Sequence, residues 1–179
     1  MSAQYSTSQQ AMINVLESHV GAELRGDLET TMETMTGNPH LHNVPTMVGG
    51  YGYQGVKSFY SNHLVGKFFP PDVEMKRVSL TVGDAQIVEE LIISFTHTTV
   101  IDWMLPGLRP TGKKAKVGFV VIVGIKDEKI THEHIYWDQA CVLVQLGLLD
   151  AMGLPVCGAE SAERIMNPML PTRSDFKLP

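Results

Sequence analysis

Residues 130–145 read ITHEHIYWDQACVLVQ, the last of several β-rich stretches in the chain. β-branched and aromatic residues are frequent here, so the stretch predicts a strand that runs from residue 130 to about residue 145. Side chains alternate between the two faces of a strand. The prediction therefore places an unusual density of titratable groups on one face, namely His132, His134, Tyr136 and Asp138.

The β-rich stretches follow a helical part of the chain. Apolar residues recur at helical spacing over residues 9–35, which predicts one long helix or two helices joined near Gly26-Asp27. After a break at Gly37-Asn38-Pro39 we expect an extended segment at 40–48, a glycine-rich turn and a helix at 56–65. Strands are predicted at 73–82, 87–102, 115–125 and 130–145. Helices followed by a run of mainly antiparallel strands predict an α+β fold, in which a strongly curved sheet wraps around the helices as a cone.

Composition and charge limit the class of protein. The chain has 179 residues, 44% hydrophobic and 18% charged, which is typical of one globular domain. Its net charge of -5, with 14 Lys+Arg against 19 Asp+Glu, gives no reason to expect nucleic acid as a partner. The chain lacks an apolar run that could cross a bilayer, and its first ten residues are polar, so we expect a soluble cytoplasmic protein without a membrane partner.

The last thirty residues differ from the rest. We expect residues 1–149 to form the domain and residues 150–179 to form a Pro-rich extension with a short helix at 160–166. The extension could cross to a partner or cover the mouth of a pocket. Cys141 and Cys157 lie among apolar neighbours without metal-ligand spacing, which favours packed thiols over a disulfide.

Four phrases, in their order along the chain, carry a family resemblance. They are HVGAE at 19–23, GVKSFY at 55–60, Glu90 with THT at 96–98 and PTGK at 110–113, and YWDQ at 136–139 with VLVQLGL at 142–148. Together they resemble the SnoaL-like polyketide cyclase or ester cyclase branch of the nuclear transport factor 2-like superfamily, over about residues 9–149. The resemblance implies the cone fold and a small-molecule pocket. It leaves the reaction open, because the superfamily contains cyclases, isomerases, dehydratases and hydrolases.

Asp138 is the first candidate for acid–base chemistry. By resemblance, polyketide cyclases of this branch use an aspartate on the last strand to move a proton at a substrate carbon. Asp138 stands between an apolar strand and Val142–Val144, so we expect its carboxylate to be partly buried and its pKa to be raised. The alternative is an aspartate that caps a backbone turn or pairs with a cation.

Further candidates surround Asp138 in this interpretation. His97 and His134 would hold or polarise a substrate oxygen, although His97 could equally be satisfied by its threonine neighbours and His134 could face water. His19 and Glu23, at i and i+4 of a helix, either point into the cone or form a structural pair. The candidates for substrate binding are Glu90, His40, Tyr53, Tyr60, Trp103 and Trp137.

Several histidines also suggest a metal site, because imidazole is a good ligand for zinc and iron. The histidines concerned are His40, His42, His97, His132 and His134. They lack the fixed spacing of known metal motifs, so we expect neither a metal nor another cofactor.

The functional prediction is a cofactor-free enzyme that cyclises, isomerises, dehydrates or hydrolyses a small hydrophobic carbonyl or lactone compound. The alternative is a binding module of the same fold without catalysis, or an interaction protein. Apolar β-rich runs at 91–95 and 117–123 also predict a homodimer through the sheet face.

Overall fold

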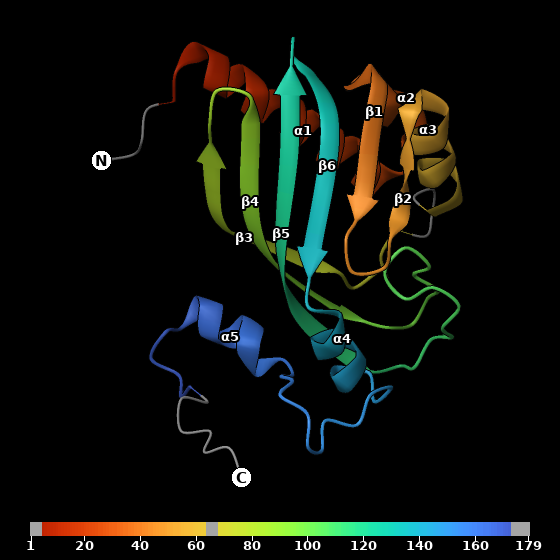
Figure 1. Ribbon diagram of the computed structural model, residues 1–179, viewed down its shortest axis with the longest axis vertical. Coiled ribbons are helices and arrows are strands. Elements are labelled where there is room, and N and C mark those ends of the chain that lie inside the picture. The colour runs from red at the N-terminus through yellow and green to blue at the C-terminus, as the bar shows by residue number, and fades with distance from the viewer. Residues whose placement is uncertain (1–4, 64–67, 173–179) are drawn as a thin grey trace.

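The computed structural model describes residues 5–63 and 68–172 and contains one curved, unclosed sheet with helices against it (Figure 1). The strands are β1 (Met35–Asn43), β2 (Val48–Tyr51), β3 (Glu74–Val82), β4 (Gln86–Thr96), β5 (Lys114–Lys126) and β6 (Lys129–Trp137). They lie in the order β2-β1-β6-β5-β4-β3. Neighbours are antiparallel except β1 and β6, which are parallel. The α+β prediction with a mainly antiparallel sheet is confirmed.

The helices are α1 (Thr7–Arg25), α2 (Leu28–Glu33), α3 (Gly52–His63), α4 (Gln139–Gln145) and α5 (Glu160–Met166). Helix α1 runs behind the sheet in Figure 1, on its concave face. Ser6 and Gln9 form a capping box at its start, and Gly26, at a φ of 68°, ends it in the left-handed conformation. Asp27 then caps α2 by accepting a hydrogen bond from the Thr30 N–H at 3.1 Å. The predicted helical region is therefore two helices joined at Gly26-Asp27.

Besides the strand predicted at 87–102, which ends at Thr96, three further predicted boundaries are wrong. Strand β1 continues through Gly37-Asn38-Pro39, because a register shift between Met35 and His40 accommodates the proline within the strand. The glycine-rich segment is not a simple turn but supplies β2 and the start of α3. A Cβ at Gly49 would lie 2.0 Å from the Leu41 carbonyl oxygen, so this close strand pairing requires glycine.

The third wrong boundary is the end of the last strand, which stops at Trp137 rather than near Gln145. Asp138 accepts a hydrogen bond from the Cys141 N–H at 3.0 Å and so acts as the N-cap of α4. Asp138 therefore begins helix α4, and the buried residues of this helix are Cys141 and Val142.

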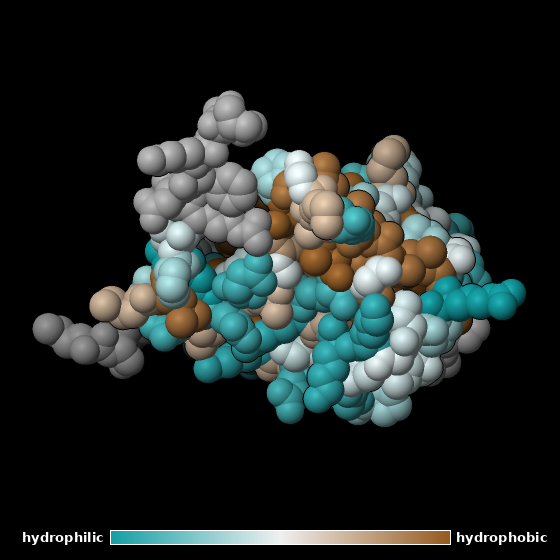
Figure 2. Space-filling view, turned by 90° about the horizontal axis from the view of Figure 1, so that it is seen from below, coloured by the Kyte–Doolittle hydropathy of each residue, from teal (hydrophilic) through white to brown (hydrophobic). Residues whose placement is uncertain are grey.

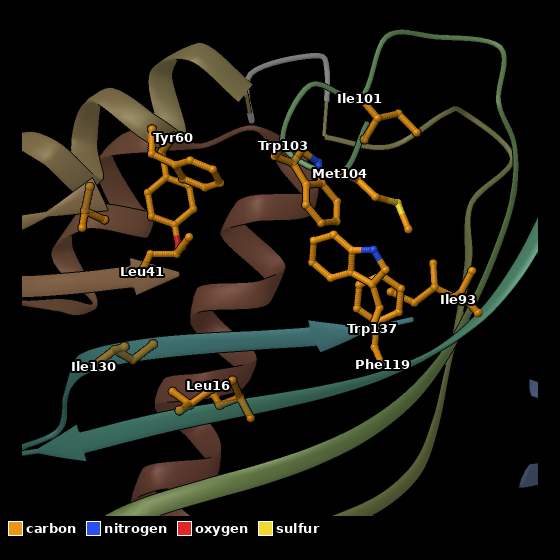
Figure 3. Packing of buried hydrophobic residues seen from close by; sticks show 14 of the residues in the cluster. Leu16, Leu41, Tyr60, Ile93, Ile101, Trp103, Met104, Phe119, Ile130 and Trp137 are labelled. Carbon is orange, nitrogen blue, oxygen red and sulfur yellow. The ribbon is translucent and has the colours of Figure 1, made fainter. Parts of the chain in front are cut away.

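The core lies between α1, α3 and the concave face of the sheet. Figure 3 shows Trp103 facing Trp137, with Phe119 beside Trp137. The Trp103 and Trp137 rings meet edge to face at 5.6 Å, and Phe119 stacks on Trp137 at 5.3 Å. Trp103, 2% exposed, belongs to the loop after β4, so this loop packs into the core.

The tail helix α5 has the predicted bounds and packs on β5. Ile165 lies close to Gly118 of β5: a Cβ added to Gly118 would lie 2.9 Å from Cδ1 of Ile165. The preceding connection exposes apolar side chains at Leu148, Met152 and Leu154. Figure 2, seen from below, shows apolar residues gathered in one area of this end of the molecule. Within residues 5–63 and 68–172 no helix is both long and apolar enough to cross a membrane.

Candidate functional site

A cavity of about 290 Å³ lies inside the cone, between α1 and the concave face of the sheet. Its walls are mostly aliphatic and aromatic, and its polar lining residues are Glu23, Asn43, Arg77, Glu89 and Glu133. Leu24 and Arg77 are the exposed members of the lining, so the cavity opens between the end of α1 and strand β3. An apolar cavity with a few placed polar groups is typical of small-molecule sites, and this volume is near the low end of their range.

A buried polar cluster forms one wall of the cavity. His19 on α1 lies with its Nε2 3.2 Å from Oε1 of Glu23 and 3.4 Å from Oε2 of Glu133 on β6. Tyr60 on α3 donates its hydroxyl proton to Glu133 Oε2 at 2.7 Å and lies 3.1 Å from His19 Nε2. His19 and Tyr60 are fully buried, and both carboxylates are less than a tenth exposed.

Hydrogen bonds on the other side of the imidazole fix one of its protons. The Thr34 hydroxyl donates to the Thr31 carbonyl at 2.6 Å, so its oxygen must accept from His19 Nδ1, 2.6 Å away. Nδ1 therefore carries a proton. Because Nε2 faces two carboxylates, a second proton there is also stabilised, and His19 is an imidazolium between Glu23 and Glu133.

The pKa shifts follow from this arrangement. Burial opposes the charged imidazole, but Glu133 and Glu23 outweigh it and raise the pKa of His19 to about 10. Burial raises the pKa of Glu23, an effect that His19 offsets only in part. Burial also acts to raise the pKa of Glu133, but His19 and the Tyr60 hydroxyl outweigh it, so the pKa of this carboxyl is lowered. Two carboxyls on one cavity thus have pKa values that move in opposite directions, as in acid–base pairs of enzymes.

Two more polar groups line the cavity away from this cluster. Arg77 on β3 donates through Nε to Glu89 on β4, and Glu89 is almost fully buried. Asn43 on β1 donates its amide to the Val48 carbonyl at 3.1 Å. The Oδ1 of Asn43 is buried without a hydrogen-bond partner among the described residues, so it can accept from a ligand in the cavity.

The cluster also meets the geometric requirement of a metal site. His19, Glu23 and Glu133 each offer one ligand atom, and these atoms lie within 4.8 Å of one another. The imidazolium balances the charge of one of the two buried carboxylates, and the raised pKa of Glu23 favours a neutral form of the other. The Nε2 proton of His19 points to the position that a metal ion would take.

Asp138 lies apart from this cavity. Its side chain is exposed, contrary to the expected partial burial, because it caps α4 at the outer surface. With Glu90, Cys141 and Ile165 it lines a separate depression on the outer side of the sheet. The contacts of Asp138 agree with the alternative interpretation, in which this aspartate caps the backbone.

His97 is fully buried at the end of β4 but does not line the cavity. The Thr111 N–H donates to its Nδ1 at 3.3 Å, so the proton of the neutral ring is on Nε2. Burial lowers the pKa of His97, which favours this neutral form. Its Nε2 has no hydrogen-bond partner among the described residues. His97, His134 and Asp138 are thus on different parts of the molecule and do not converge.

The period-two prediction for β6 was right that His132, His134 and Tyr136 share a face, but Asp138 lies beyond the strand and the face that they share is not the one that lines the cavity. His132, His134 and Tyr136 lie on the outer face, together with His40 of β1, because Leu41 and Glu133 between them point into the cavity. On β4, likewise, Glu89 lines the cavity, whereas Glu90 accepts from the Ser79 hydroxyl at 3.1 Å outside it.

Of the remaining substrate-binding candidates, Trp103 lines the cavity and Tyr60 belongs to the polar cluster. Trp137 is 8% exposed and packs behind Trp103 and Phe119. Tyr53 is exposed at the start of α3. For His19 and Glu23 the sequence left two interpretations, side chains that point into the cone or a structural ion pair. Both describe the structure, because the two side chains point into the cone and also form an ion pair with each other.

Sequence reasoning missed Glu133. The signal was present in the alternation of β6, because Glu133 shares its face with Ile135 and Trp137, whereas the opposite face carries two histidines, Tyr136 and Asp138. The more apolar face of a strand is the one that faces a core. A lone glutamate on that face needs buried partners, which His19 and Tyr60 supply.

Comparison with known proteins identifies the fold. Neither a family model nor a curated protein matches the chain. Among solved structures, a candidate SnoaL-like polyketide cyclase from Jannaschia sp. CCS1 matches with a TM-score of 0.63 and 14% identity, over 82% of this chain and 99% of that one. A candidate hydroxylase from Streptomyces galilaeus matches with a TM-score of 0.58 and 17% identity, over 80% and 89%.

A third similar structure is an epoxide hydrolase/cyclase-like enzyme of pyran-ring formation in salinomycin. It matches with a TM-score of 0.55 and 15% identity, over 74% of this chain and 95% of that one. At such identities the likeness concerns the fold, which several kinds of enzyme share. The chain therefore has the nuclear transport factor 2-like fold, in the form seen in SnoaL-like polyketide cyclases.

Proposed function

We propose that the chain is a small-molecule acid–base enzyme that isomerises, cyclises, dehydrates or hydrolyses a hydrophobic carbonyl or lactone compound in the cavity of the cone. The observation that carries the proposal is the pair of carboxyls, Glu23 and Glu133, which line one apolar cavity and share the imidazole of His19. Similar structures with catalytic descriptions, a polyketide cyclase and an epoxide hydrolase/cyclase-like enzyme, support it at the level of fold.

Glu23 is the residue that moves the proton in this proposal. It lines the cavity near the mouth, and burial raises its pKa, which favours the protonated carboxyl that can donate to a substrate oxygen. The Tyr60 hydroxyl donates to Glu133 and stabilises its ionised form, and Glu133 in turn keeps His19 charged beside Glu23. His19 does not line the cavity and is a positioning residue.

The remaining polar groups indicate what the substrate carries. Asn43 presents a buried acceptor oxygen, which suits a hydroxyl or an N–H on the ligand. Arg77 at the mouth donates to Glu89, and its Nη1 lies 3.7 Å from Oε1 of Glu17. Its remaining guanidinium N–H groups suit a carbonyl or carboxylate oxygen of the ligand. The substrate is therefore a compact apolar molecule with one donor and one acceptor oxygen.

The test uses bicyclic ketones and medium-chain lactones, each with and without a hydroxyl group. Exchange at the carbon next to the carbonyl is followed by NMR in D₂O, and lactone hydrolysis by chromatography. We expect turnover by the wild type and a loss of about 10²-fold or more in the Glu23→Gln variant, as for removal of a general acid or base. The Glu90→Gln variant, the same change on the outer face of the sheet, is the control and should turn over normally.

Two results would decide against the proposal. Equal turnover by Glu23→Gln and wild type would remove Glu23 from the chemistry. Saturable binding of these compounds in the cavity without any turnover would favour the alternative, a non-catalytic binding module. The expected homodimer through the sheet face stays a prediction, which analytical ultracentrifugation can test.

A further inference from the structure

Four histidines form a block on the outer face of the sheet. Strands β1 and β6 pair in parallel so that His40 lies beside His132 and His42 beside His134. Because side chains alternate along both strands, the four imidazoles share the face opposite to Leu41 and Glu133, which line the cavity. All four are partly buried, so they lie at the surface and solvent can reach them.

Within this block the rings are in contact. The Nε2 atoms of His40 and His134 are 3.0 Å apart. The His40 and His132 rings are stacked with centroids 5.0 Å apart, and the His132 and His134 centroids are separated by 4.8 Å. Two imidazole nitrogens bound to one metal ion, at about 2.0–2.1 Å each, would lie roughly 2.8–3.0 Å apart at an angle of 90° and roughly 3.3–3.4 Å apart at the tetrahedral angle. The His40–His134 separation of 3.0 Å fits the smaller angle, and a shift of a few tenths of an ångström would give the larger one.

The neighbouring strand leaves room for the block. Gly124 of β5 pairs with His132, and a Cβ at Gly124 would lie 2.2 Å from Cε1 of the His132 ring. Only glycine therefore allows His132 to lie flat across β5 in its present position. This glycine is independent of the histidine spacing and supports a built arrangement rather than a chance gathering of polar surface residues.

We propose that His40 and His134 bind a late first-row divalent metal ion such as Zn²⁺ or Cu²⁺ on the outer face of the sheet, with His132 stacked on His40 as a positioning residue. Imidazole ligands suit these ions, and a two-histidine surface site leaves positions for water. The site is on the opposite face from the cavity and does not depend on the proposed catalytic function.

The test is calorimetric titration of tag-free, chelator-treated protein with Zn²⁺. We expect one ion per chain on the outer face, and an affinity at least about tenfold lower in His40→Asn and in His134→Asn, because loss of a ligand costs no less than loss of a supporting hydrogen bond. His63→Asn, a histidine at the end of α3, is the matched control and should bind as the wild type does. Glu23→Gln should also leave this binding unchanged, which separates it from any ion held inside the cone.

Electron paramagnetic resonance with Cu²⁺ gives a second readout that does not depend on affinity. Coupling to two or more imidazole nitrogens is expected in the wild type, and one fewer in the His134→Asn variant. If the wild type binds the metal ion no more tightly than His134→Asn does, the proposal is overturned. The His40–His134 contact is then only a hydrogen bond between two imidazoles. Binding abolished by Glu23→Gln but not by His40→Asn would overturn it too, in favour of the inner cluster.

Discussion

The charged state of His19 predicts that the protein loses stability as the pH rises above neutral. The pKa of His19 is about 10 in the folded protein and 6.5 without its partners. The folded pKa is the higher one, so the folded state holds a proton that the unfolded chain releases between these two values. The stabilisation is complete below pH 6.5 and is lost progressively up to about pH 10.

The expected magnitude follows from linkage. Within this pH window one proton separates the two states, which corresponds to about 1.4 kcal/mol of unfolding free energy per pH unit. Between pH 7.5 and pH 9 the loss should therefore reach roughly 2 kcal/mol. For a domain of this size a loss of that order lowers the melting temperature by roughly 4–8 °C.

Urea denaturation at several pH values between 7 and 9 measures this slope. Burial raises the pKa of the Cys141 thiol, which adds a slope of the same sign, so the comparison belongs in a Cys141→Ala background. In that background His19→Gln should remove most of the slope, while His63→Gln should keep it. The His19→Gln variant leaves two buried carboxylates without their cation and could fail to fold. In that case NMR titration of the His19 ring protons in the wild type measures the pKa directly.

A flat stability profile between pH 7 and 9, or an NMR pKa for His19 below 7, would refute the reasoning. Either result would mean that the imidazole is neutral in the folded state. Glu23 or Glu133 would then have to be protonated to satisfy the buried contacts at 3.2 and 3.4 Å.

Three further substitutions test separate parts of the structure. Tyr60→Phe removes a hydrogen bond to a buried carboxylate and should cost about 1.5–3 kcal/mol in urea denaturation, whereas Tyr53→Phe at an exposed ring should stay within about 0.5 kcal/mol. Asp138→Ala should cost about 0.5–2 kcal/mol through loss of the α4 cap and leave turnover unchanged; a large loss of turnover would return Asp138 to the chemistry. Trp103→Ala should cost about 3–5 kcal/mol and enlarge the cavity, which larger ligands would reveal by tighter binding.

Much of the fold could be predicted because local signals and the family resemblance agree. Capping residues and glycine at 26–27 divide the first helical region where expected, and the short tail helix has its predicted bounds. Boundaries failed where tertiary contacts override local preference. Pro39 is accommodated by a shift in register against β6, which is distant in sequence, and Asp138 starts a helix in a stretch whose residues favour strands.

The candidate site was harder to predict for a different physical reason. Period two sorts the residues of β6 into two faces but does not state which face is covered, and the wrong choice moves every side chain to the other side. This pattern predicts that His134 faces the pocket, whereas the prediction for Asp138 rests on the family resemblance. The structure places both residues, and His40 of β1, outside the cavity. For Glu89 and Glu90 the sequence likewise does not state which of the two faces the cavity, and only the pairing of β4 with β3 and β5 decides it.

The alternation of β6 also explains how one strand can serve two kinds of chemistry. Glu133 faces the cavity and joins α1 and α3 through His19 and Tyr60, while its neighbours His132 and His134 face outward beside β1. Glu133 and Glu23 raise the pKa of His19, whereas burial lowers the pKa values of His132 and His134 and neighbouring imidazoles lower them further. Burial and the sign of the neighbouring charges therefore separate the charged histidine inside the cone from these two outer histidines.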